Sequence, residues 1–184
     1  MPYSLRLAGA ADLPWLPPLE IAAGACFADV GMDAIAADAP PSLDELAGYQ
    51  RDGRAWVVAA APGMPVAYLL ADLVDDEAHV SQVSVHPAHA GHGLGAALIN
   101  TCELWGYARG AHGTTLTTFA DVPWNAPYYA RLGFVVVPDD ALPAGLAEIR
   151  ERERACGLDR WPRVAMRRGA AADRGLRGRK FGVH

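Results

Sequence analysis

The chain has 184 residues, of which 52% are hydrophobic and 20% are charged, and its net charge is −5. Such a length and composition fit one soluble globular domain with a full-size core, and no apolar run is long enough to cross a bilayer. The N-terminus has no basic start followed by an apolar stretch, so we expect no secretory signal. The three cysteines lie far apart and form no CxxC pair, which argues against a disulfide framework or a zinc site and predicts reduced thiols in a cytoplasmic protein.

Hydrophobic periodicity and turn residues predict strands and helices in alternation along the chain. A helix is expected over residues 11–27, a short helix or loop over 29–39, and a helix over 42–52 that opens with a capping box at Ser42 and Glu45. Further helices are expected from Leu94, between Asn125 and Gly133, and over 146–155. Strands are predicted at residues 3–7, 55–60, 66–73, 79–86, 114–118, 134–137 and 163–168. This order predicts an α/β fold, a mixed sheet flanked by helices.

The most informative stretch runs from Val83 to Leu98 and is expected to form a strand, a glycine turn and a helix. Pro87 stops the strand because proline has no N–H group for a ladder hydrogen bond. The turn holds Gly91, Gly93 and Gly95, which allow sharp turns and close approach of a ligand. The free N–H groups and the positive dipole end of the following helix form a seat for an anion, most naturally a phosphate.

Two common phosphate-binding motifs do not fit this glycine turn. A P-loop requires a lysine after its last glycine, whereas Ala96 follows Gly95 and the chain's only lysine is Lys180. A dinucleotide fingerprint requires GxGxxG, whereas the sequence here is GxGxG followed by alanines. A tight turn without a ligand is the remaining alternative.

The stretch resembles motif A of the GNAT superfamily of N-acetyltransferases, in which a strand ending V-x-P leads into [QR]-x-x-G-x-[GA]. The matching residues are Val85-His86-Pro87 and Ala90 to Gly95. Ala90 replaces the family's usual Gln or Arg, and His92 stands where many members have Arg, so we expect binding through backbone N–H groups and with less cationic charge. The resemblance implies acetyl-CoA as co-substrate, bound by Val83, Ser84, Val85, Ala90, Gly91, His92, Gly93, Leu94, Gly95 and Ala96.

A second segment, from Trp124 to Phe134, resembles the family's motif B, N…Y-x-x-x-G-F. Asn125 suits a helix N-cap and Gly133 suits a helix end. The resemblance adds Asn125 and Tyr129 to the cofactor-binding residues, although Asn125 lies closer to Tyr129 than in many members. It also implies that Tyr129 protonates the thiolate of CoA, since a phenol with a pKa near 10 remains protonated beside a thiol.

The general base is left open by the sequence. Many family members carry a glutamate on the central strand, but residues 79–86 contain none. His79 is the catalytic candidate, because an imidazole has a pKa near 6.5, and bound water is the alternative. We place Glu20 and Phe27 of the first helix at the acceptor site, where Glu20 is a candidate substrate ligand or second base; a solvated helix carboxylate is the alternative for Glu20, and the one that its position in a helix favours. The histidine spacing predicts no metal site.

The resemblance implies a mostly antiparallel, twisted sheet of about seven strands that splays at its central strands, in one GNAT domain over residues 1–168. The function implied is direct transfer of an acetyl group to the primary amine of a small molecule or peptide. A non-catalytic CoA-binding module of the same fold is the alternative. Residues 169–184 form a basic tail, for which a mobile terminus is favoured over a nucleic-acid contact. We expect no membrane association, and a monomer or homodimer. The acidic net charge favours solubility, and secondarily cationic substrates such as amines.

Overall fold

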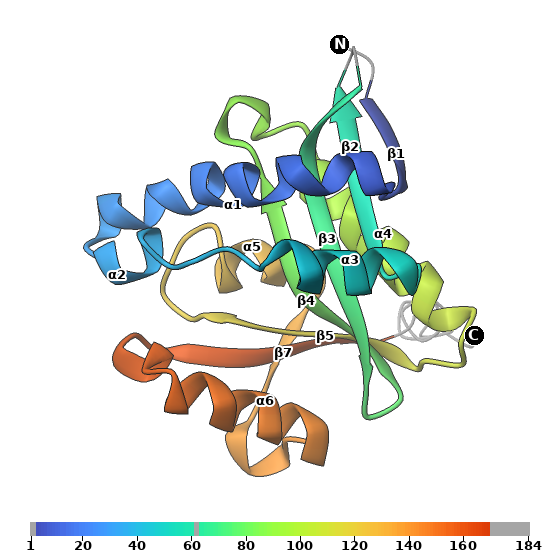
Figure 1. Cartoon of the computed structure of the whole chain (residues 1–184). Helices are drawn as coiled ribbons and strands as arrows, with labels where there is room; N and C mark the ends of the chain where they lie inside the picture. Colours follow the sequence, from blue (N-terminus) through green and yellow to red (C-terminus); the bar gives the residue numbers. More distant parts are fainter. Residues whose placement is uncertain (1–2, 61–62, 170–184) are drawn as a thin grey trace, which may run out of the picture. The chain divides into compact units, whose positions relative to one another are not determined.

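A computed structural model describes residues 3–60 and 63–169 (Figure 1). Apart from Gly169, the predicted basic tail lies outside the described residues. The chain divides into two compact units. Unit 1 takes the chain up to Asp72 together with Val80–Cys102, and unit 2 takes Leu73–His79 together with the chain from Glu103 onward. Within the described ranges, no helix has both the length and the apolar character needed to span a membrane.

Seven strands form one open mixed sheet, as expected, and their order in the sheet is β1-β2-β3-β4-β5-β7-β6. Antiparallel pairing joins β1 to β2, β2 to β3, β5 to β7 and β6 to β7, whereas β4 and β5 are parallel. The register between β4 and β5 covers Ala78 opposite Thr114 and His79 opposite Thr115. The strands are β1 (Tyr3–Leu7), β2 (Ala55–Ala60), β3 (Met64–Val74), β4 (Glu77–Val85), β5 (Gly113–Phe119), β6 (Val135–Val137) and β7 (Arg163–Gly169).

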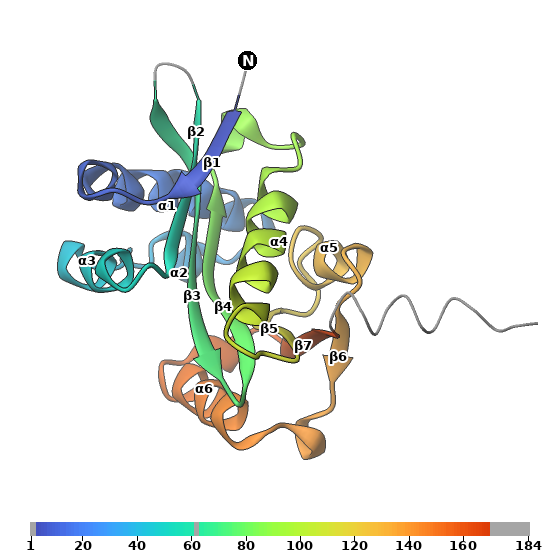
Figure 2. The ribbon, with the colours of Figure 1, turned by 90° about the vertical axis from the view of Figure 1, so that its right-hand side faces the viewer.

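In unit 1, helices cover both faces of the strands (Figure 2). The helices α1 (Leu16–Gly24) and α3 (Leu43–Arg51) lie on one face, and the first turns of α4 (Leu94–Tyr107) lie on the other. Alternate residues of each strand point to opposite faces. The core beneath α1 and α3 therefore collects residues spaced by two along β2 and β3, together with leucines of the helices: Leu13, Leu16, Leu19, Leu46, Ala55, Val57, Tyr68 and Leu70.

The first helical region differs from the continuous helix expected over residues 11–27. It consists of a 3-10 helix, η1 (Ala10–Trp15), then α1, then a second 3-10 helix, η2 (Ala25–Val30). Prolines at the first positions of α1 explain why the α-helix begins only at Leu16, because proline is tolerated in a first turn but not in a helix interior. A short helix, α2 (Asp33–Ala36), follows.

The capping box of α3 forms as predicted. The Glu45 N–H donates to the Ser42 hydroxyl, and the Ser42 N–H donates to the Glu45 carboxylate at 2.8 Å. These contacts satisfy two of the N–H groups that a helix start leaves without partners.

In unit 2, the turn between β3 and β4 supports a distant helix. Asp75 and Asp76 form this two-residue turn with φ of 51° and 59°, values that aspartate tolerates better than most residues. The Asp75 carboxylate accepts hydrogen bonds, both 2.9 Å long, from the N–H groups of Gly145 and Leu146. These N–H groups begin α6 (Ala144–Ala155), whose own N-cap is a proline without a capping side chain. Asp75 thus supplies the missing cap.

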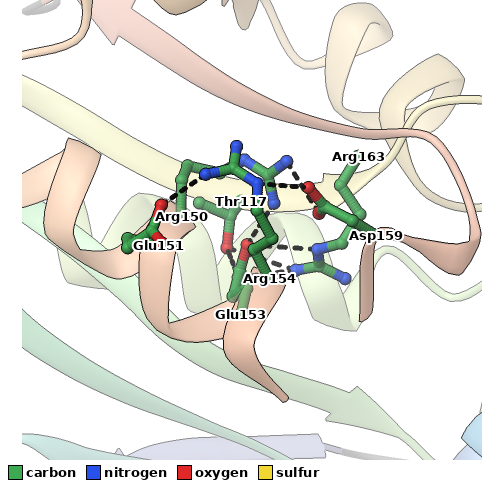
Figure 3. A network of polar contacts seen from close by, with 7 residues as sticks. All are labelled: Thr117, Arg150, Glu151, Glu153, Arg154, Asp159 and Arg163. Atoms are coloured by element: carbon green, nitrogen blue, oxygen red, sulfur yellow. Dashed lines mark hydrogen bonds and ion pairs between the residues drawn. The ribbon is translucent and has the colours of Figure 1, made fainter. Parts of the chain in front are cut away.

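A network of charged side chains ties α6 to β5 and β7 in unit 2 (Figure 3). Glu153 of α6 accepts hydrogen bonds from Thr117 of β5 and from Arg163 of β7, and it pairs with Arg150 at 2.6 Å. Three guanidinium groups and three carboxylates take part, so the network is close to neutral: Arg150, Arg154 and Arg163 with Glu151, Glu153 and Asp159.

The rest of unit 2 surrounds a buried ion pair. Figure 2 shows α6 and α5 (Ala126–Arg131) on opposite sides of β5 and β7. Arg168 of β7 pairs with Glu103 of α4 at 2.7 Å, with side-chain exposures of 5% and 7%. The Arg168 guanidinium also lies 4.9 Å from the ring centre of Phe134. Removing either partner of an ion pair buried this deeply would leave the other charge without compensation, which destabilises the folded protein.

Candidate functional site

The end of β4 and the loop after it lie entirely in unit 1. Ser84 is buried and hydrogen-bonded to the Gln82 amide at 2.9 Å, while Val83 and Val85 are partly buried. His86 and Pro87 then end the strand, and a single 3-10 turn, η3 (Pro87–His89), leads into the glycine loop. The strand, turn and helix therefore occur in the order that the sequence predicts.

Two of the three loop glycines adopt a conformation that other residues avoid. Gly91 has a φ of 77° and Gly93 a φ of 73°, both in the left-handed region. A Cβ atom added to either would meet nothing within 4 Å, so backbone conformation and not crowding requires glycine here. Gly95 differs from the expectation, because it lies inside α4 with an ordinary helical backbone and is buried.

The first turn of α4 offers hydrogen-bond donors beside this loop. The Gly93 carbonyl accepts the first helical hydrogen bond, from the Ala97 N–H at 3.0 Å. The N–H groups of Leu94, Gly95 and Ala96 therefore have no acceptor within the helix, and the helix dipole adds positive potential there. An anion such as a phosphate is the ligand that this arrangement favours.

Aromatic side chains hold the loop in place. The Tyr3 hydroxyl is hydrogen-bonded to His89 Nδ1 at 3.0 Å, and the Tyr3 ring packs edge-on against His89 and His92. The His92 ring donates a hydrogen bond from Nδ1 to the Ala90 carbonyl at 3.0 Å, so Nε2 is the ring nitrogen that takes no part in this bond. Ala90 itself is exposed. His89 and His92 thus pack beside the loop with Tyr3, while position 90 carries no polar side chain.

Tyr129 lies on α5 in unit 2, packed between two other aromatic rings. Its ring centre is 5.4 Å from that of Tyr128 and 6.0 Å from that of Phe134. Burial, with the neighbouring Tyr128, raises the pKa of the Tyr129 phenol above its usual value near 10. The structure gives its hydroxyl no hydrogen-bond partner among residues 3–60 and 63–169. Tyr129 is thus a protonated donor without an internal acceptor.

Asn125 occupies the N-cap position of α5, as expected, but its side chain does not cap the helix. Its amide nitrogen donates to the Thr118 hydroxyl of β5 at 2.8 Å. Its amide oxygen is buried and has no partner in the described part of the chain. A buried acceptor of this kind is costly unless a ligand or water supplies a donor, so the oxygen is suited to an amide N–H of a bound molecule.

His79, the predicted base, is enclosed within unit 2. Its side chain is 4% exposed, and its Nδ1 is 3.0 Å from the Thr115 hydroxyl of the neighbouring strand β5. Two further residues of β4 make polar contacts: Glu77, at the start of the strand, pairs with Arg167, and Ser81, in its middle, donates to Asp72. His79 is therefore buried and held by a hydrogen bond to a neighbouring strand. Its assignment as the general base stays a prediction.

The model of the acetyltransferase (GNAT) family matches residues 25–134, which is more than half of the chain. The chain belongs to this family. The matched region contains β4, the glycine loop, α4 and the motif with Asn125 and Tyr129. Acetyl transfer is accordingly the family activity, and acetyl-CoA is its co-substrate.

Solved structures with the same fold include several N-acetyltransferases. The ribosomal-protein-S18-alanine N-acetyltransferase of Escherichia coli is 20% identical, with a TM-score of 0.61 over 91% of this chain and 94% of its own. The PaiA N-acetyltransferase of Thermoplasma acidophilum, solved with coenzyme A, is 13% identical, with a TM-score of 0.66 over 92% of this chain and 99% of its own. Rv2747 of Mycobacterium tuberculosis, solved with CoA, is 19% identical, with a TM-score of 0.64 over 90% of this chain and 98% of its own. At these identities the likeness shows the fold.

In this GNAT acetyltransferase, the two predicted acceptor residues lie on the first helical region. Phe27 is on η2 and partly buried, and Glu20 is on α1 and partly buried. Glu20 is not the solvated helix carboxylate that the sequence left as the alternative. Burial and the nearby Asp38 raise the pKa of its carboxyl to about 7, and the hydroxyl of Tyr68 donates to its Oε2.

Sequence reasoning missed the partners of the predicted residues. Tyr68 supports Glu20, Thr118 supports Asn125, and Tyr3 supports the loop histidines. Each partner is distant in sequence from the residue it supports or lies on a different element, so no local spacing reveals it. The one available signal was Tyr68 itself, a hydroxyl within the otherwise apolar stretch from Met64 to Ala71 of β3. In the described ranges, no group of three or more His, Cys, Asp or Glu residues is arranged to hold a metal ion.

Proposed function

We propose that this protein transfers the acetyl group of acetyl-CoA directly to the primary amine of a small molecule or a peptide. The observation that carries the proposal is the strand-loop-helix geometry at His86 to Ala96, with left-handed Gly91 and Gly93 and three free N–H groups at the start of α4. This geometry suits the pyrophosphate of CoA. Family membership supplies the chemistry.

Each step of direct transfer has a group in the chain that suits it. The amine nitrogen attacks the thioester carbonyl, a new C–N bond forms and the C–S bond breaks. Backbone N–H groups at Val83 and Val85 are proposed to orient the pantetheine arm and polarise the carbonyl, as the family resemblance implies. Tyr129 is proposed to donate its proton to the departing thiolate, which its protonated phenol is able to do. Asn125, with its unpaired amide oxygen, is proposed to accept a hydrogen bond from an amide of the arm.

The acceptor is proposed to be an amine that binds beside an acidic helical region. Between Leu7 and Gln50 the chain has seven acidic residues and no Lys, Arg or His. Such a region attracts a positively charged molecule and repels an anionic one. Amines that carry a second positive charge, such as diamines and basic peptides, are therefore the first substrates to test.

The test is turnover of acetyl-CoA, followed by release of free CoA thiol, against neutral, diamine and peptide amines. Thiol release that depends on one of these amines, with the acetylated amine identified by mass spectrometry, is the expected result. CoA binding without thiol release on any amine would instead support the non-catalytic CoA-binding module, an alternative favoured by Ala90 and by the enclosure of His79. Absence of CoA binding would overturn both.

A further inference from the structure

The Glu20 side chain stands out among the acidic residues of the first helical region. It is partly buried and lies on α1, whereas Asp12 is buried but paired with Arg6, and Asp29, Asp33 and Asp38 are exposed. Burial disfavours a charged carboxylate, and Asp38 adds a like charge, so the pKa of Glu20 is raised to about 7. At neutral pH this carboxyl group can both take up and release a proton.

A buried tyrosine holds the Glu20 carboxylate in position. Tyr68 of β3 is 0% exposed, and its hydroxyl donates to Glu20 Oε2. Its ring belongs to the apolar core beneath α1 and α3, which leaves the hydroxyl few alternative orientations. Oε1 of Glu20 remains available to a second partner, because the recorded bond engages Oε2 only.

The register of the strands places this pair beside the end of β4. The Val66 carbonyl of β3 accepts a hydrogen bond from the His86 N–H at 2.8 Å. Because the two-residue turn makes these strands antiparallel, Tyr68, two residues from Val66, lies opposite the Val83–Ser84 stretch of β4. Ser84 belongs to the β4 segment that is proposed to hold the pantetheine arm. The Glu20–Tyr68 pair therefore approaches the strand that would present the acetyl group.

We propose that Glu20 is the general base of acetyl transfer, and that Tyr68 is the residue that positions it. This inference rests on the proposed function. As the amine nitrogen bonds to the acetyl carbon, its surplus proton passes to a Glu20 carboxylate oxygen, and the thiolate that leaves takes its proton from Tyr129. One proton is thus removed and one supplied, and no further reagent is required.

Two observations favour Glu20 over the alternatives. Glu77, the glutamate of β4, stands at the start of the strand and is paired with Arg167, and His79 is 4% exposed and engaged with Thr115. A base is most effective when its pKa lies near the working pH, and the value for Glu20 meets this condition. The other titratable groups on elements packed against α1 are Asp12, paired with Arg6, on η1, Cys26 and Asp29 on η2, and Asp33 on α2.

The decisive experiment compares the pH dependence of kcat and kcat/KM in the full-length protein and four variants, using an amine that the wild type acetylates. Glu20→Gln keeps an acceptor oxygen for Tyr68, so the fold is expected to persist, and its kcat should fall by about 10²–10⁴-fold. Asp38→Asn removes a like charge and should move the acid limb of the profile to lower pH. Tyr68→Phe removes a hydrogen bond to the ionised form and should move the same limb to higher pH.

Asp29→Asn is the matched control, because it removes one negative charge from the same helical region without touching Glu20. It should leave the acid limb in place. Ionisation of the amine contributes equally to all variants, so differences between variants report on Glu20. Thermal unfolding of each variant shows whether a loss of rate reflects a loss of folded protein. If Tyr68→Phe does not fold, the Asp38→Asn shift alone still tests the assignment.

Opposite shifts in Asp38→Asn and Tyr68→Phe, together with the loss in Glu20→Gln, would support the assignment. A Glu20→Gln enzyme with kcat within about threefold of wild type and an unchanged acid limb would overturn it while leaving the proposed function intact, since a general base contributes about 10²-fold or more. An increase in KM alone, equal in Glu20→Gln and Asp29→Asn, would also overturn it and would assign Glu20 to charge attraction of the acceptor. A wild type that acetylates no amine would refute the proposed function, and the base with it.

Discussion

The replacement Tyr129→Phe separates a chemical role of this residue from a structural one. The change removes only the phenolic hydroxyl, and the ring keeps its contacts with Tyr128 at 5.4 Å and Phe134 at 6.0 Å. Because the hydroxyl has no hydrogen-bond partner among the described residues, its removal leaves no polar group unpaired. We therefore expect the free energy of unfolding to change by less than about 0.5 kcal/mol, or about 2 °C in Tm for a protein of this size.

The effect on catalysis should be much larger. If Tyr129 protonates the CoA thiolate, kcat should fall by about 10²–10⁴-fold, which corresponds to about 3–5 kcal/mol of transition-state stabilisation. Binding of acetyl-CoA should be nearly unchanged, because the proton is transferred only during the reaction. The raised pKa of the phenol keeps it protonated through neutral and mildly alkaline pH, so Tyr129 should cause no loss of rate below about pH 10.

The assay combines thiol release under saturating acetyl-CoA, calorimetric binding of CoA and thermal unfolding. Tyr128→Phe is the control, because it removes the same group from the adjacent tyrosine on the same helix. A Tyr129→Phe enzyme whose kcat stays within about twofold of wild type would refute the general-acid role, since the expected loss is at least about 10²-fold. A fall in Tm of several degrees without a matching loss of kcat would show that the hydroxyl is structural.

Three further predictions concern the loop and the buried ion pair. Gly93→Ala forces a side chain into a left-handed backbone, so it should cost ~1–2 kcal/mol of stability and weaken CoA binding at least about tenfold. Gly110→Ala, at a position that is also left-handed and uncrowded, should cost a similar amount of stability but leave CoA binding intact. Equal losses of CoA binding in the two variants would contradict the loop assignment. Ala90→Arg should tighten CoA binding at low salt, with a gain that shrinks as salt rises, and an unchanged Kd at low salt would show that position 90 is remote from the phosphates. Glu103→Gln leaves Arg168 buried without its charge partner and should lower the free energy of unfolding by about 3–5 kcal/mol, measured by thermal unfolding. Glu151→Gln, in an exposed ion pair, should lower it by less than about 1 kcal/mol. Equal effects would show that burial does not set the contribution of these ion pairs to stability.

The sequence was sufficient for the order of elements and for the loop because both depend on local chemistry. The capping box at Ser42 and the glycine turn at Gly91 and Gly93 form as predicted, and the aspartate turn at residues 75–76 is likewise a short-range feature. The family match also follows from local motifs. The start of the first α-helix was not predicted correctly. The prolines near Leu16 permit both a 3-10 and an α-helical turn, and these two conformations differ little in energy.

Only the tertiary structure decided which side chains meet. The Asp75 carboxylate caps α6 from some 70 residues away, and Tyr68 reaches Glu20 from 48 residues away. Such contacts arise when strands and helices pack, and a residue's spacing along the chain does not encode them. The pKa of Glu20 likewise depends on burial and on Asp38, so a side chain that the sequence allowed to be a solvated carboxylate acquires its raised pKa only in the folded protein.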